Sequence, residues 1–140
     1  MKPWSTPKER TMPAFRKYFT LEEARAWLPE LRARFQRIHS LYAELHQLRA
    51  AFEAAQRVIH GNGSRPKDTG FEARAQELTE ILRGIMEAGI EVKDVGRGLV
   101  DFPYLMDGHE VFLCWELSED DIRYWHPIDA GYAGRVPLDG

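Results

Sequence analysis

The amino-acid sequence predicts an α+β fold, in which a long antiparallel helical hairpin packs on a three- to four-stranded antiparallel β-meander with an ordered C-terminal tail. Two observations predict it. Apolar residues recur every three or four positions over residues 21–59 and 71–85, as along one face of a helix. From residue 99 they alternate at every second position, as in half-buried strands. We therefore expect a single domain at 19–140, with the helical hairpin at 20–89 and the sheet and tail at 90–140.

The first helix is expected to begin after Thr20. Thr20 and Glu23 have the spacing of a capping box, in which each side chain accepts a hydrogen bond from the other residue's backbone N–H. Pro29 lies inside the helical pattern and lacks a backbone donor, so we expect a kink near residues 25–28. The apolar positions of this helix are 21, 24, 28, 31, 35, 38, 42 and 45, and after a three-residue step 48, 52, 55 and 59.

The second helix is expected to be much shorter. Glycine, asparagine and proline at 60–66 predict a mobile loop, after which helical spacing resumes at Thr69 or Phe71 and ends at Gly89. At 1.5 Å per residue the two helices would be about 58 Å and about 28 Å long. The apolar stripe of the first helix therefore extends past its partner. This mismatch predicts a homodimer formed through the first helix.

The sheet is expected to be a meander of consecutive antiparallel strands. Asp107-Gly108 predicts a two-residue type I′ turn, which requires positive φ at both positions. A second turn is expected at 118–121. Strands are expected at 99–104, 110–117 and 122–126, with an edge strand or extended chain at 91–95. The two turns predict the pairs Met106–His109, Phe102–Leu113, Asp101–Cys114, Val100–Trp115, Leu117–Ile122, Trp115–Tyr124, Cys114–Trp125 and Glu116–Arg123.

The outer face of this sheet, which points away from the helices, is expected to gather polar side chains. The tail after residue 126 is too apolar to be disordered and should pack on this face. Charges of both signs beside an aromatic wall could bind a small polar ligand, or could form a structural ion-pair network that holds the tail. His126 is expected at the margin of the opposite face, bonded to a backbone carbonyl or to Asp129. The candidate ligand-binding residues are Asp101, Glu116, Arg123, Trp125, His126, Asp129 and Arg135.

The expected register predicts no catalytic residue, metal site or cofactor. Cys114 and His126 would be suitable as a nucleophile and its base, but this register places them on opposite faces of the sheet. His109 and His126 would share a face but lie about 13 Å apart along the strand, which disfavours a metal site that uses both imidazoles. Because Cys114 is the only cysteine, one chain can form neither a disulfide nor an all-cysteine metal site.

Charge is unevenly distributed along the 140 residues, although the net charge is only −3. Residues 1–19 hold five basic groups and one acid, giving +4, whereas 91–140 hold four basic groups and eleven acids, giving −7. We expect residues 1–18 to form a flexible basic arm. Five cations without a second basic surface make a nucleic-acid partner improbable. No stretch approaches the roughly 20 apolar residues that span a bilayer, so we expect a cytoplasmic protein without a membrane partner.

Three stretches resemble a known family. They are FTLEEARAWLPELR, LVDFPYLMDGHEVFLCWEL and YWHPIDAGYAGRVPL, and over about residues 18–138 the chain is similar to the small bacterial family catalogued as domain of unknown function 2203. The resemblance implies no activity. The arm before Tyr18 and the turn at 118–121, where the family pattern has glycine, depart from it. The pattern matches at Asp101, Phe102, Pro103, Gly108, Cys114, Trp115, Trp125, His126, Asp129, Gly131, Gly134, Arg135 and Pro137.

Two functions remain open on the sequence alone. The first is a non-catalytic interaction or regulatory module that acts as a homodimer, with an unidentified protein partner possible. The alternative is a small-ligand-binding or metal-assisted hydrolytic enzyme that uses the carboxylate and arginine cluster of the outer face. A closed, charge-paired outer face would favour the module, and an open cleft with converging carboxylates would favour the enzyme.

Overall fold

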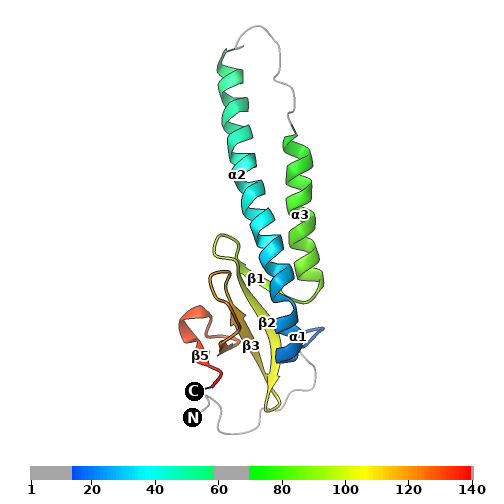
Figure 1. Ribbon diagram of the computed structural model, residues 1–140, viewed down its shortest axis with the longest axis vertical. Coiled ribbons are helices and arrows are strands. Elements are labelled where there is room, and N and C mark those ends of the chain that lie inside the picture. Colours follow the sequence, from blue (N-terminus) through cyan, green and yellow to red (C-terminus); the bar gives the residue numbers. More distant parts are fainter. Residues whose placement is uncertain (1–13, 59–69, 140) are drawn as a thin grey trace.

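The computed structural model describes residues 14–58 and 70–139 (Figure 1). It confirms the predicted α+β class, with five strands in place of three or four. The predicted loop at 60–66 and residues 1–13 of the basic arm lie outside the described residues. The elements are α1 (Leu21–Ala26), α2 (Leu28–Val58), α3 (Phe71–Glu87), β1 (Glu91–Asp94), β2 (Leu99–Met106), β3 (His109–Trp115), β4 (Tyr124–Pro127), η1 (Tyr132–Gly134) and β5 (Val136–Pro137).

Local sequence signals determine where the helices begin and end. The capping box at Thr20 and Glu23 is present, and the predicted kink is a break at Trp27, which separates α1 from α2. Pro29 thus lies in the first turn of α2, where backbone N–H groups have no partner within the helix. At the end of α3, Gly89 has φ +93°, and its N–H and that of Ile90 bond back to the last turn in a Schellman motif.

The two long helices form the predicted antiparallel hairpin, which projects from the sheet (Figure 1). Arg37 bonds Glu77 through two nitrogens at 2.7 and 2.8 Å, and Arg74 bonds Glu44 at 2.7 Å. The apolar stripe of α2 differs from the prediction at two positions: Tyr42 is 47% exposed while its neighbour Leu41 is fully buried, and Phe52 is 41% exposed. None of the described helices combines the length and apolar character needed to cross a membrane.

The five strands are antiparallel and follow chain order, β1-β2-β3-β4-β5. Asp107 and Gly108 have φ +52° and +80°, as the predicted type I′ turn requires, and the β2–β3 register is the predicted one. The inner face of the sheet packs against α1 and the lower part of α2. Its core includes Leu31, Phe35 and Ile38 from α2 and Val100, Phe102, Leu113 and Trp115 from the sheet.

The predicted β3–β4 register is wrong by one residue. Cys114 pairs with Tyr124, and Leu113 pairs with Trp125. The segment that connects β3 to β4, residues 116–123, is longer than a tight turn and is bonded to α2. Arg32 Nη2 donates to the backbone oxygens of Glu119 and Asp120, both at 3.0 Å. The shift moves Trp125 to the inner face, where it is 3% exposed within the core. It moves His126 to the outer face.

Candidate functional site

A buried polar cluster lies on the outer face where β2, β3 and β4 run side by side. Asp101 is directly opposite Cys114, and His126, opposite Phe112, lies diagonal to Cys114. Their exposed fractions are 2%, 1% and 2%. The closest carboxylate, thiol and imidazole atoms lie within 4.8 Å of one another. We call these three residues the outer-face cluster.

Both ring nitrogens of His126 face oxygen atoms. Nε2 lies 3.0 Å from Asp101 Oδ2, and Nδ1 lies 2.7 Å from the backbone oxygen of Pro127. Burial alone would lower the pKa of His126, but the hydrogen bonds to Asp101 and to Pro127 outweigh it, so this pKa is raised. Lys93 on β1 acts in the opposite direction. Below pH 6.5, the ordinary pKa of histidine, most of the imidazole is therefore protonated and forms a buried ion pair with the Asp101 carboxylate.

This raised pKa makes the stability of the protein depend on pH. A histidine whose pKa is higher in the folded state contributes its full stability below its ordinary pKa of 6.5, and loses that contribution as pH rises through the folded-state pKa. We therefore expect the free energy of unfolding, measured with urea in the presence of chelator, to carry a component that declines as pH rises above 6.5. His126→Gln should remove this component and His109→Gln should keep it; equal pH profiles for wild type and His126→Gln would contradict the assignment.

Cys114 is a poor nucleophile despite its position beside His126. Burial, together with the neighbouring Asp101 carboxylate, raises the pKa of its thiol to about 12. The prediction that Cys114 and His126 lie on opposite faces is wrong, because the β3–β4 register places them on the same face. The chemistry nevertheless gives no thiolate–imidazole dyad in this arrangement, since both imidazole nitrogens bond to oxygen.

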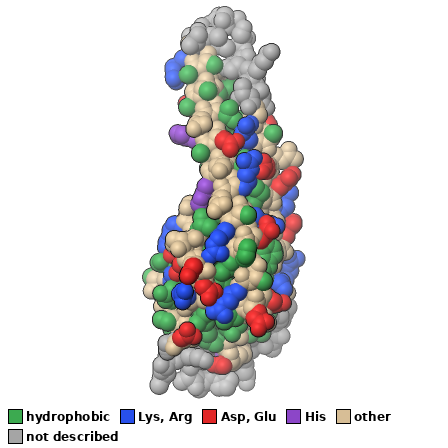
Figure 2. Space-filling model, viewed as in Figure 1, with side chains coloured by type: hydrophobic (Ala, Val, Ile, Leu, Met, Phe, Trp, Pro, Cys, Tyr) green, Lys and Arg blue, Asp and Glu red, His purple; other side chains and the backbone are tan. Residues whose placement is uncertain are grey.

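The prediction that the apolar tail packs on the outer face is wrong, because the tail joins the sheet edge as β5 and its Val136 and Leu138 pack against the core. Only its polar side chains meet a second group of charges on the outer face. Arg135 Nη2 donates to Glu119 Oε1 at 2.6 Å and to the Cys114 backbone oxygen at 3.2 Å. Its guanidinium also stacks over Tyr124, 4.2 Å from the ring centroid. Glu116, which is 3.8 Å from Arg135, accepts hydrogen bonds from Arg97 and Tyr132. Acidic and basic side chains are likewise intermingled over the sheet-bearing half of the surface in Figure 2.

The structure does not bring the seven candidate residues together in one site. Asp101 and His126 join in the outer-face cluster, and Glu116 and Arg135 join in the tail network. Trp125 lies on the inner face, in the core. Arg123 bonds Asp120 at the surface, at 3.1 Å, and Asp129 is exposed on the tail. Cys114 in the outer-face cluster, and Arg97, Glu119 and Tyr132 in the tail network, are not among the candidates predicted from the sequence.

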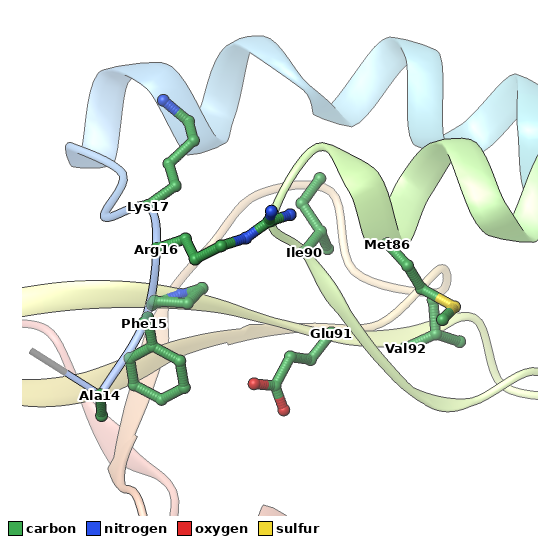
Figure 3. A pocket seen from close by; sticks show the side chains of 10 residues that line it. Ala14, Phe15, Arg16, Lys17, Met86, Ile90, Glu91 and Val92 are labelled. Carbon is green, nitrogen blue, oxygen red and sulfur yellow. The ribbon is translucent and has the colours of Figure 1, made fainter.

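A surface recess of about 430 Å³ lies at the edge of the sheet, between the N-terminal segment and the α3–β1 connection (Figure 3). Arg16 and Lys17 come from the N-terminal segment, and Met86 and Glu91 from the other side. The residues of the outer-face cluster do not line it. The segment that carries these cations is held on the sheet through Phe15, whose ring lies 5.2 Å from that of Phe112.

Comparison with known proteins identifies the family and nothing narrower. No curated protein matches the chain, and no solved structure matches it. The model of a family described as "Uncharacterized conserved protein (DUF2203)" matches residues 17–138, which include the whole sheet, the outer-face cluster and the tail network. The chain therefore belongs to the DUF2203 family.

Proposed function

We propose that this protein is a non-catalytic interaction module that acts as a homodimer, joined along the distal part of α2. The observation that carries the proposal is the unequal length of the helical hairpin. The guanidinium of Arg49 lies 5.7 Å from the ring centroid of Phe71, the first residue of α3. Residues 50–58 therefore extend α2 by about 13 Å beyond the start of α3. Figure 1 shows this extension at the end of the molecule remote from the sheet.

The composition of the extension suits a second copy of the same helix. Residues 50, 51, 54 and 55 are alanine, which allows two helix backbones to approach closely, and Phe52 between them is 41% exposed. Two identical surfaces pair through a two-fold axis. Leu48 and Ala55, four residues before and three residues after Phe52, lie on the same helix face as Phe52, so an antiparallel pair centred on Phe52 would bring apolar side chains of both copies together.

The closed outer face supports the non-catalytic part of the proposal. The outer-face cluster is at most 2% exposed, and the carboxylate of Glu116 is occupied by Arg97 and Tyr132. Asp129, which the enzyme alternative requires beside these groups, is exposed and takes part in neither group. The carboxylates therefore do not converge on an open cleft, as hydrolysis at this face would require.

The test is the mass of the full chain in solution. We expect sedimentation equilibrium to give a dimer for the wild type and a monomer for Phe52→Glu, because burying two carboxylates at the centre of the interface is strongly unfavourable. Met86→Glu is the matched control, since Met86 is 58% exposed on α3 at the opposite end of the hairpin. It should remain dimeric. A monomeric wild type, or a dimeric Phe52→Glu with unchanged helix content, would refute the proposed interface.

A further inference from the structure

We infer that the outer-face cluster is a binding site for one divalent transition-metal ion of the Zn²⁺ type, held by an Asp101 carboxylate oxygen, Cys114 Sγ and His126 Nε2. One carboxylate, one thiolate and one imidazole make a mixed oxygen, sulfur and nitrogen donor set. Zn²⁺ and Co²⁺ accept such a set, whereas Mg²⁺ and Ca²⁺ prefer oxygen ligands only. The site is independent of the proposed dimer interface, which lies on the distal part of α2.

The separation of the donor atoms fits a single ion. Ligand distances of about 2.0–2.3 Å in a tetrahedral zinc site place the donor atoms roughly 3.5 Å from one another. In the structure the three donor atoms lie within 4.8 Å of one another, and His126 Nε2 lies 3.0 Å from Asp101 Oδ2. The widest of these separations exceeds the tetrahedral spacing by little more than about 1 Å. The three residues lie on neighbouring strands of one sheet, so the backbone already holds the site together.

An unpartnered oxygen gives independent support for a ligand. Asp101 is 2% exposed, and its Oδ1 has no hydrogen-bond partner, although its Oδ2 bonds His126. A buried carboxylate oxygen without a partner is costly, and native proteins rarely retain one without a reason. Coordination of a cation between Asp101 and Cys114 would satisfy this oxygen.

The orientation of His126 also suits a metal ligand. Its Nδ1–H donates to the backbone oxygen of Pro127 at 2.7 Å, which leaves Nε2 as the atom that faces Asp101 and the thiol. Metal-binding histidines usually donate their other ring N–H to a carbonyl or a carboxylate in this way, because that bond fixes the ring orientation. The existing His126–Asp101 hydrogen bond therefore occupies the place that the ion would take.

The charges balance when the ion binds. The imidazolium loses its Nε2 proton and the thiol loses its Sγ proton, so the carboxylate and thiolate together offset the charge of a divalent cation. The Arg135 guanidinium, bonded to the backbone oxygen of Cys114, favours the thiolate. Both protons leave to solvent, and the cluster remains neutral before and after binding.

Cobalt binding to the full chain tests the site. After treatment with chelator, we expect the wild type to bind one Co²⁺ per chain with a near-ultraviolet thiolate-to-cobalt charge-transfer band, which one equivalent of Zn²⁺ removes. Cys114→Ser should lose the band and bind Co²⁺ at least about tenfold more weakly. His109→Gln, which changes a histidine at the β2–β3 turn, is the control and should retain both. A wild type that binds no Co²⁺, or binds it without the charge-transfer band, would overturn the inference.

A second measurement needs no variant and therefore does not depend on whether Cys114→Ser folds. X-ray absorption of the zinc-loaded wild type should show one sulfur ligand at about 2.3 Å and nitrogen or oxygen ligands at about 2.0–2.2 Å. Coordination by nitrogen and oxygen alone would place the zinc on surface groups and refute the site. Zinc should also raise the unfolding temperature of the wild type, because it binds only where the three strands are assembled.

Discussion

Replacing Asp101 by alanine is expected to lower the free energy of unfolding of the metal-free protein by about 3–5 kcal/mol. The substitution removes the partner of the His126 imidazolium, whose side chain is 2% exposed, and leaves a buried charge without its counter-charge. In the variant, either the His126 imidazolium stays buried without a counter-charge, or the imidazole loses the proton that Asp101 stabilises in the wild type, and both outcomes cost stability. Urea unfolding at pH 6 in the presence of chelator measures the loss.

A double-mutant cycle separates the ion pair from the volume change. Asp101→Asn keeps the size of the side chain and a hydrogen-bonding oxygen, so it should cost less than Asp101→Ala. His126→Leu removes the charge that Asp101→Ala would leave unpaired, so the double variant Asp101→Ala/His126→Leu should be less destabilised than the sum of its two single variants. Additive losses, or a loss below about 1 kcal/mol for Asp101→Ala, would contradict the buried ion pair.

Trp115→Ala is expected to cost about 3–5 kcal/mol as well, through a different mechanism. Trp115 is the largest of the fully buried side chains. Its indole Nε1–H donates to the backbone oxygen of Glu119 at 3.0 Å, and the guanidinium of Arg32 lies 5.4 Å from the ring centroid. The truncation therefore leaves a cavity between α2 and the sheet and removes one bond that shapes the β3–β4 connection. Urea unfolding monitored by circular dichroism, which does not depend on the lost tryptophan, measures the effect.

Two controls identify the source of that loss. Trp115→Phe retains most of the volume but not the N–H donor, so it should fall between the wild type and Trp115→Ala. Leu105→Ala changes an apolar residue of the same sheet that is 47% exposed, and should cost less than about 0.5 kcal/mol. If Trp115→Ala cost no more than Leu105→Ala, the core described between α2 and the sheet would be wrong.

The β2–β3 register could be predicted because its determinants are local. Asp107 and Gly108 are adjacent in the sequence, and a type I′ turn allows only one pairing of the strands that it joins. The same reasoning applies to the ends of the helices, where Thr20 and Gly89 act within their own turns. For such features the sequence pattern and the structure agree residue by residue.

The β3–β4 register could not be predicted because distant residues determine it. Arg32 on α2 bonds the backbone of Glu119, 87 positions away, and Arg25 bonds Asp121, 96 positions away. No local pattern reveals these contacts. The error of one residue reversed the faces of Trp125 and His126, since successive side chains point to opposite sides of a strand. Because of this error the sequence did not predict that His126 lies beside Cys114 on the outer face.

The composition of the candidate site was predictable only in part. The pairing of Asp101 with Cys114 follows from the turn. The approach of Arg135 to Glu116 was also predicted, although the tail reaches that position as edge strand β5 and does not pack its apolar residues on the outer face. The roles of Arg97 and Glu119 depend on how the β1–β2 turn and the β3–β4 connection come together. Their side chains meet Glu116 and Arg135 only after the tertiary structure forms.

The two outermost strands determine how the sheet can meet other chains. An exposed sheet edge is a template for strand addition and for aggregation. Here β1 has four residues and an irregularity between Val92 and Asp94, with Lys93 on its exposed side. At the other edge β5 has two residues, of which Pro137 has no N–H to donate. Neither edge offers a continuous ladder of free backbone groups. The sheet therefore resists edge-to-edge polymerisation, and an extended peptide could not add to it as a further strand.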